Sequence, residues 1–132
     1  VSFQIADASM KMDAARSFIY TAASAIDAKV DNNRARRYVS EAKKFVTETC
    51  QDVVHKSMQV MGGIGYTNIY PVEKIYRDIR LATIWTGSNE VMSMITSHEW
   101  YKEVFEQMDK KVTRDCENDC LEADAKDEKV YE

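Results

Sequence analysis

Apolar residues recur at helical spacing over most of this 132-residue chain. In residues 1–30 they form two stripes rather than one, a pattern typical of a helix that is covered on more than one side. A second helical pattern runs over residues 34–61, after an Asp-Asn-Asn turn at 31–33 that can cap it. Two long helices joined by such a short turn are expected to pack antiparallel.

Two further helices are predicted after the glycines of residues 62–65. The first covers about residues 72–85, with Pro71 suited to its start, and the second covers residues 89–108. Val91, Met94, Ile95 and His98 would share one face of the last helix. The predicted fold is therefore all-α, an up-and-down four-helix bundle, which by itself names no function.

Charge is distributed unevenly along the chain. Residues 1–105 carry 13 basic and 12 acidic side chains, whereas residues 106–132 carry 5 basic and 10 acidic ones. The acidic end, and the lack of a basic stripe with interleaved aromatic residues, argue against nucleic-acid binding. We therefore expect a helical domain over residues 1–105 and an acidic C-terminal extension over residues 106–132.

Cysteine content and the two ends of the chain bear on its compartment. The odd set Cys50, Cys116 and Cys120 favours a reducing environment, and no metal site is expected from their spacing. No signal peptide or membrane-spanning run is visible. The helical pattern is already present at Val1 with no capping residue before it, as expected for a piece of a longer protein. We expect a cytoplasmic protein, or one of the mitochondrial matrix if the source is eukaryotic.

The glycines gather at two helix junctions. Gly62, Gly63 and Gly65 follow the second helix, and Gly87 precedes the last one. A glycine after a helix can end it in the left-handed conformation, or it can let a ligand approach the backbone. A helix start presents free N–H groups and a positive dipole end, which suit a phosphate, a carboxylate or a carbonyl oxygen.

The stretch that contains both junctions is "QVMGGIGYTNIYPVEKIYRDIRLATIWTGSNEVM", residues 59–92. It resembles the C-terminal signature of the acyl-CoA dehydrogenase family. That family carries Gln-x-x-Gly-Gly-x-Gly-Tyr, then Tyr-Pro-Val-Glu-Arg/Lys and Tyr-Arg-Asp, and finally Gly-Thr/Ser-x-Glu/Gln at a helix start. The segment "FQIADASMKMDAARSFIY" is similar to the opening helix of the same domain, so the resemblance covers about residues 1–105.

The resemblance implies a flavoprotein oxidoreductase of lipid metabolism and fatty acid β-oxidation. With FAD, such an enzyme dehydrogenates an acyl-CoA substrate to the trans-2-enoyl-CoA and passes electrons to an electron-transfer flavoprotein. The resemblance also implies a homo-oligomer, a homotetramer or a dimer. This chain would be the C-terminal domain for flavin binding and oligomerisation, and we expect it to be inactive alone.

The resemblance also implies roles for individual residues. A first group would touch the ADP part of FAD bound by the neighbouring subunit: Gln59, Val60, Met61, Gly62 and Gly63. Ser88 and Glu90 would hold the FAD of their own subunit. Gly87 would lie beside the acyl thioester, and Trp85 would line the pocket, although an ordinary core role suits Trp85 as well.

One position departs from the family pattern. Many members place the catalytic Glu immediately before the glycine, where this chain has Thr86, which cannot act as a base. The base either lies upstream of Val1, as in the long-chain and isovaleryl types, or is missing from the enzyme. Two alternatives stay open: a catalytically silent helical domain for assembly or partner binding, and another flavoenzyme of the superfamily, such as an oxidase.

Overall fold

The structure, a computed structural model, describes residues 1–109, which fall in two units, residues 1–100 and residues 101 onward. The helices are α1 (Ser2–Asp27), α2 (Asn32–Met61), α3 (Gly63–Tyr66), α4 (Val72–Ala82) and α5 (Asn89–Asp109). The all-α class with four long helices is therefore confirmed, and α3 is an additional single turn. Most of the predicted acidic extension, with Cys116 and Cys120, lies outside the described residues. In the second unit, the rings of Tyr101 and Phe105 stack within α5 at a centroid distance of 6.3 Å.

Both ends of α2 form as the sequence predicts. At its start, the Asp31 carboxylate accepts hydrogen bonds from the backbone N–H groups of Asn33 and Arg34, at 2.9 and 3.4 Å. This cap provides partners for two donors that have none inside the helix. At its end, Gly62 takes a φ of +64°, a left-handed conformation that glycine adopts without a steric penalty.

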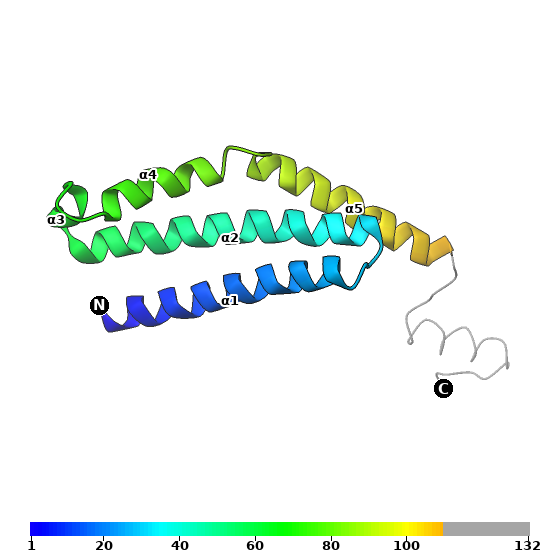
Figure 1. Ribbon diagram of the computed structural model, residues 1–132, viewed down its shortest axis with the longest axis horizontal. Helices are drawn as coiled ribbons and strands as arrows, with labels where there is room; N and C mark the ends of the chain where they lie inside the picture. Colours follow the sequence, from blue (N-terminus) through cyan, green and yellow to red (C-terminus); the bar gives the residue numbers. More distant parts are fainter. Residues whose placement is uncertain (110–132) are drawn as a thin grey trace, which may run out of the picture. The chain divides into compact units, whose positions relative to one another are not determined.

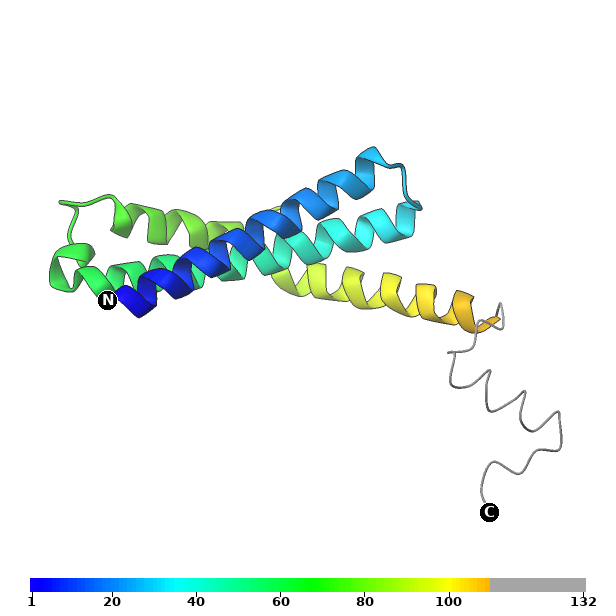
Figure 2. The same ribbon diagram turned by 90° about the horizontal axis from the view of Figure 1, so that it is seen from below.

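Helices α1 and α2 pack against each other and run antiparallel (Figure 1), and Figure 2 shows that α1 crosses α2 obliquely. Small side chains dominate the buried positions of this pair, namely Ala15, Ala22, Ala25 and Ala42. Phe18 and Phe45 add a tilted ring contact with centroids 5.7 Å apart. Most of the other large apolar side chains of α1 are exposed, and Phe3 reaches 85% exposure. Only one of the two predicted stripes of α1 is therefore covered within the described residues.

Helix α4 and the first part of α5 follow one another along α2. Three contacts mark this course: Tyr76 with His55, Asn89 with Thr47, and Glu99 with Arg36. The residue number rises along α4 and α5 while the number of the partner on α2 falls. Both helices thus run opposite to α2, and the turn at residues 83–88 joins them without reversing the chain (Figure 1).

The apolar face predicted for the last helix is not the face that the chain buries. Val91 is 43% and Met94 is 70% exposed, whereas the polar residues Asn89 and Glu99 are buried. The Glu99 carboxylate accepts a hydrogen bond from the Arg36 guanidinium at 3.1 Å. Polar contacts of Asn89 and Glu99 therefore help to join residues 89–100 to α2. Of the predicted apolar face, Ile95 is half-buried, while Val91, Met94 and His98 are exposed.

Candidate functional site

The predicted site residues lie in two separate places, one at the end of α2 and one beside its middle. Gln59 to Gly63 form the end of α2 and the start of α3, whereas the segment from Trp85 to Glu90 lies beside Thr47. Gln59 follows Thr47 by twelve positions, which is about 18 Å along a helix. The structure therefore keeps the two groups apart within the chain.

The first group, at the end of α2, has exposed backbone without side chains at its two glycines. Gly62 and Gly63 are exposed, and a Cβ atom added at either would meet nothing within 4 Å. Gly65 is different, because it is buried and its Cβ would lie 2.8 Å from Cβ of Met61. Gly65 thus lets α3 pack on the end of α2, while Gly62 and Gly63 leave open a surface that another group can approach closely.

The other residues of this first place are also accessible. Gln59 and Val60 are exposed, and Met61 is half-buried. An open, mostly apolar hollow between α1 and α2 begins here, lined by Gln4, Ile5, Ala8, Lys56, Ser57, Val60 and Met61. The predicted contacts of Gln59 to Gly63 would therefore be made from the surface of this chain.

The second place is a turn with unusual backbone geometry. Thr86 has a φ of +50° and Gly87 a φ of +90°. Such a value is ordinary for glycine but rare for a β-branched residue. The exposed Thr86 hydroxyl donates to the Trp85 carbonyl oxygen at 2.9 Å, and the Trp85 side chain is 56% exposed. Position 86 thus presents its side chain outward, with no group that can accept a proton as a base.

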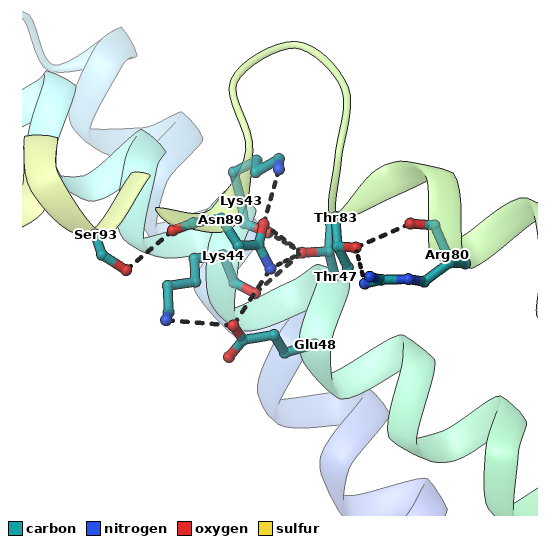
Figure 3. A network of polar contacts seen from close by, with 8 residues as sticks. All are labelled: Lys43, Lys44, Thr47, Glu48, Arg80, Thr83, Asn89 and Ser93. Carbon is teal, nitrogen blue, oxygen red and sulfur yellow. Dashed lines mark hydrogen bonds and ion pairs between the residues drawn. The ribbon is translucent and has the colours of Figure 1, made fainter. Parts of the chain in front are cut away.

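Side chains of α2 hold this turn from one side (Figure 3). The Lys43 ammonium donates hydrogen bonds of 2.8 Å to the Gly87 carbonyl oxygen and to Oδ1 of Asn89. Nδ2 of the buried Asn89 donates to Oγ1 of Thr47 at 3.1 Å and to Oε1 of Glu48 at 3.3 Å. The start of α5 is therefore tied to the middle of α2.

The other end of the turn is anchored on α4. The buried Thr83 hydroxyl accepts a hydrogen bond of 2.8 Å from Arg80 and donates one of 2.9 Å to the Arg80 carbonyl oxygen. The Thr83 carbonyl oxygen accepts the backbone N–H of Asn89 at 3.0 Å. This backbone hydrogen bond joins the two ends of the turn.

An open polar cleft borders the turn and contains two predicted site residues, Ser88 and Glu90. Its lining also includes Glu48, Gln51, Arg80, Thr83, Ile84 and Asn89. A hydrogen bond from the Ser88 hydroxyl, with the N–H of the helix start and the nearby Lys44 and Arg80, holds the pKa of Glu90 below its usual range. A carboxylate with a lowered pKa is a weaker base than one at its usual value.

Sequence reasoning missed the residues that hold the turn, above all Lys43, Thr47 and Asn89. The signal available for Lys43 and Thr47 was a polar pair four residues apart, beside the apolar stripe of α2. Arg77 and Asp78 of the Tyr-Arg-Asp motif do not pair with each other. Each forms an ion pair along α4, Arg77 with Glu73 and Asp78 with Lys74.

Within residues 1–109, no group of three or more His, Cys, Asp or Glu side chains is arranged to hold a metal ion. In the same range, none of the helices combines the length and apolar character needed to cross a bilayer.

Known proteins match this chain over most of its described length. The family model for the acyl-CoA dehydrogenase C-terminal domain matches residues 1–100. The chain is 41% identical over 103 residues to a mitochondrial isobutyryl-CoA dehydrogenase of Dictyostelium discoideum, covering 78% of this chain and 24% of that protein. It is 39% identical over 97 residues to CarC, a caffeyl-CoA reductase-Etf complex subunit of Acetobacterium woodii, covering 74% and 25%.

A solved structure shows the same fold. Butyryl-CoA dehydrogenase from Megasphaera elsdenii superposes with a TM-score of 0.70 at 31% identity, covering 76% of this chain and 25% of that one. The chain thus spans about a quarter of the length of the relatives that it matches. The matched residues contain both glycine junctions and the turn that α2 holds, and the chain therefore belongs to the acyl-CoA dehydrogenase family through its C-terminal domain.

Proposed function

We propose that this chain supplies the C-terminal helical domain of a FAD-dependent acyl-CoA dehydrogenase, which converts an acyl-CoA thioester to the trans-2-enoyl-CoA. The observation that carries the proposal is the turn at residues 83–88. Its polar side is tied to α2, and it exposes Trp85 and Thr86 next to a helix start. The names of the relatives, an isobutyryl-CoA dehydrogenase and a caffeyl-CoA reductase, support a CoA thioester as substrate.

The residues present suit FAD, which when bound supplies the hydride acceptor of the reaction. The bare backbone at Gly62 and Gly63 gives a flat approach for the ADP part of a FAD held by a neighbouring subunit. Ser88 and Glu90 border the open polar cleft at the start of α5 and would hold the FAD of their own subunit.

The proposed reaction needs a base for the α-proton of the substrate. Thr86 cannot provide it, since its hydroxyl has no acidic or basic pKa near neutrality and donates to the Trp85 carbonyl. Glu90 carries a lowered pKa, which weakens it as a base. We therefore place the base in a segment that precedes residue 1 in the complete protein, and we assign Thr86 and Gly87 to the pocket wall beside the acyl thioester.

Two partners belong to the same proposal. The name of CarC, a subunit of a complex with Etf, supports an electron-transfer flavoprotein as the electron acceptor or donor. The large exposed apolar side chains of α1, with Phe3 at 85% and Met10 at 65%, support burial of this helix in a homo-oligomer. A homotetramer or dimer would cover them.

The test uses the complete protein with FAD bound, mixed anaerobically with isobutyryl-, butyryl- and longer acyl-CoAs. We expect at least one to bleach the flavin absorbance. Thr86→Ala should retain turnover within about tenfold, because removal of a true base costs roughly a hundredfold or more. Replacing the upstream carboxylate by its amide should abolish bleaching, and adding Thr86→Glu should restore part of it.

Two outcomes would overturn the proposal. A flavin that no acyl-CoA bleaches, and that no enoyl-CoA reoxidises after chemical reduction, would favour the silent assembly domain. A substrate-reduced flavin that oxygen reoxidises as fast as the electron-transfer flavoprotein does would favour an oxidase.

A further inference from the structure

We propose that Lys43 is a positioning residue that sets which way the Gly87–Ser88 peptide faces, and thereby presents an N–H donor to the ligands of the turn. This inference rests on the proposed function, because it assigns Lys43 to the flavin- and substrate-facing turn. Lys43 itself is on α2, 44 residues before Gly87 in the sequence, and lies on the inner side of that turn.

The geometry of one peptide unit carries the argument. In a trans peptide the carbonyl of one residue and the N–H of the next lie in one plane and point in opposite directions. The Lys43 ammonium holds the Gly87 carbonyl oxygen toward α2 at 2.8 Å. The N–H of Ser88 must therefore point away from α2. A rotated peptide would turn the Gly87 carbonyl oxygen outward in its place, and an anionic or carbonyl oxygen of a ligand would then be repelled.

The turn needs such a restraint, because its own residues do not fix it. Gly87, at a φ of +90°, has access to both halves of the φ range. Thr86, at a φ of +50°, is held in a left-handed conformation that is strained for a β-branched residue, so other conformations are favoured unless it is restrained. A hydrogen bond from an ammonium group is about twice as strong as a neutral one, so Lys43 is suited to hold this conformation.

Lys43 also links the turn to the helix that follows. Its second hydrogen bond goes to Oδ1 of Asn89, which leaves Nδ2 of Asn89 for Oγ1 of Thr47 (Figure 3). One ammonium thus fixes the peptide of Gly87 and the first residue of α5 together. Because Ser88 lies between the two bonded residues, its backbone is held beside the cleft that Ser88 lines.

The experiment compares Lys43→Met, Lys43→Arg and a control, Lys74→Met, in the complete protein. Lys74 is an exposed lysine of α4 with one ion pair, to Asp78. For Lys43→Met we expect FAD to bind to the apoprotein about tenfold more weakly by flavin fluorescence, in line with a lost charge-assisted hydrogen bond. Flavin bleaching at saturating substrate should slow by a similar or larger factor. Lys43→Arg should recover part of both losses, and Lys74→Met should change neither.

A third measurement is independent of any ligand. Amide hydrogen exchange of the segment over residues 84–90 in the apoprotein should accelerate in Lys43→Met and stay unchanged in Lys74→Met. If Lys43→Met does not fold, Lys43→Gln, which keeps a neutral donor, should give the same changes in weaker form.

The possible failures can be told apart. Unchanged exchange of residues 84–90 in a folded Lys43 variant overturns the positioning role, whatever the protein binds. Faster exchange in a protein that no CoA thioester reduces supports the positioning role and overturns the proposed function. Equal losses in Lys43→Met and Lys43→Arg that follow the melting temperature alone would make Lys43 a stability residue, and would also overturn the inference.

Discussion

The two glycine junctions expose backbone in different ways. At Gly62 and Gly63, nothing within 4 Å would touch an added Cβ, and the bend follows from the φ of Gly62. At Gly87, an added Cβ would lie 2.6 Å from the Met92 side chain, and a lysine of another helix holds the carbonyl. A side chain can therefore be added at Gly63 without disturbing the chain, whereas the positive φ of Gly87 makes any side chain there strained, as it does at Gly62.

The largest effect is expected from Gly87→Ala, at the junction whose carbonyl oxygen is bonded by Lys43. The new methyl group meets Met92, and alanine at a φ of +90° is strained. We expect a loss of roughly 1–3 kcal/mol in the free energy of unfolding, typical of a forbidden backbone conformation. Flavin bleaching in the complete protein should fall by about a hundredfold, a common cost of a misplaced pocket wall.

The matched control for Gly87→Ala is the double variant with Met92→Ala. It removes the close contact and keeps the backbone strain, so it should recover only part of the stability. Full recovery would mean that the contact with Met92, and not the φ of Gly87, makes this position sensitive. Unchanged activity in Gly87→Ala alone would contradict the distinction between the two junctions.

A smaller and more selective effect is expected from Gly63→Val at the open junction. Because the new side chain meets only solvent within the chain, the melting temperature of the apoprotein should change by only a few degrees. FAD should nevertheless bind about tenfold more weakly, since a branched side chain blocks close approach to the backbone. Differential scanning fluorimetry and flavin titration measure the two quantities.

Gly65→Ala is the control for that experiment. Its Cβ would lie 2.8 Å from Cβ of Met61, so it should lower the melting temperature while leaving flavin content per folded molecule unaltered. If Gly63→Val also lowers the melting temperature and leaves the flavin content unaltered, Gly63 acts only in ending helix α2, and no ligand approaches it.

The smallest effect is expected from Thr86→Asn, which tests the strain at the held junction. Asparagine tolerates a positive φ better than a β-branched residue, so unfolding should cost about 0.5–1 kcal/mol more. Urea denaturation measures the change. Thr67→Asn serves as control, because Thr67 is exposed and has an ordinary φ of −87°. A Thr86→Asn variant no more stable than the parent would show that the ties to α2 absorb the strain.

Helix ends were readable from the sequence, because local residues determine them. Asp31 caps α2, and Gly62 ends it, as the Asp-Asn-Asn turn and the glycine run predict. The third predicted helix was too long, since α4 ends at Ala82 and Trp85 lies in the turn. Its apolar spacing continues past Ala82, but the hydrogen bonds of Thr83 to Arg80 and Asn89 close the turn instead.

Which face of a helix is covered was not readable, because periodicity defines a face without identifying what packs on it. On α5 the apolar stripe with Val91 and Met94 is exposed, while Asn89 and Glu99 face α2. The same holds for the candidate site. The motif letters named Gly87, Ser88 and Glu90, but the residues that hold them come from α2, more than forty positions earlier. Contacts between residues so far apart in the chain produce no recognisable pattern in the local sequence.

The small buried side chains between α1 and α2 affect how often these two helices separate. Ala15, Ala22 and Ala25 bury little surface each, so separation of α1 from α2 exposes few apolar atoms. In the chain alone, the amide hydrogens of α1 should therefore exchange with solvent much faster than those in the middle of α2. A partner surface that binds over the exposed Phe3, Met10 and Tyr20 would hold α1 against α2. Its binding would then be measured as slower amide exchange along the whole of α1.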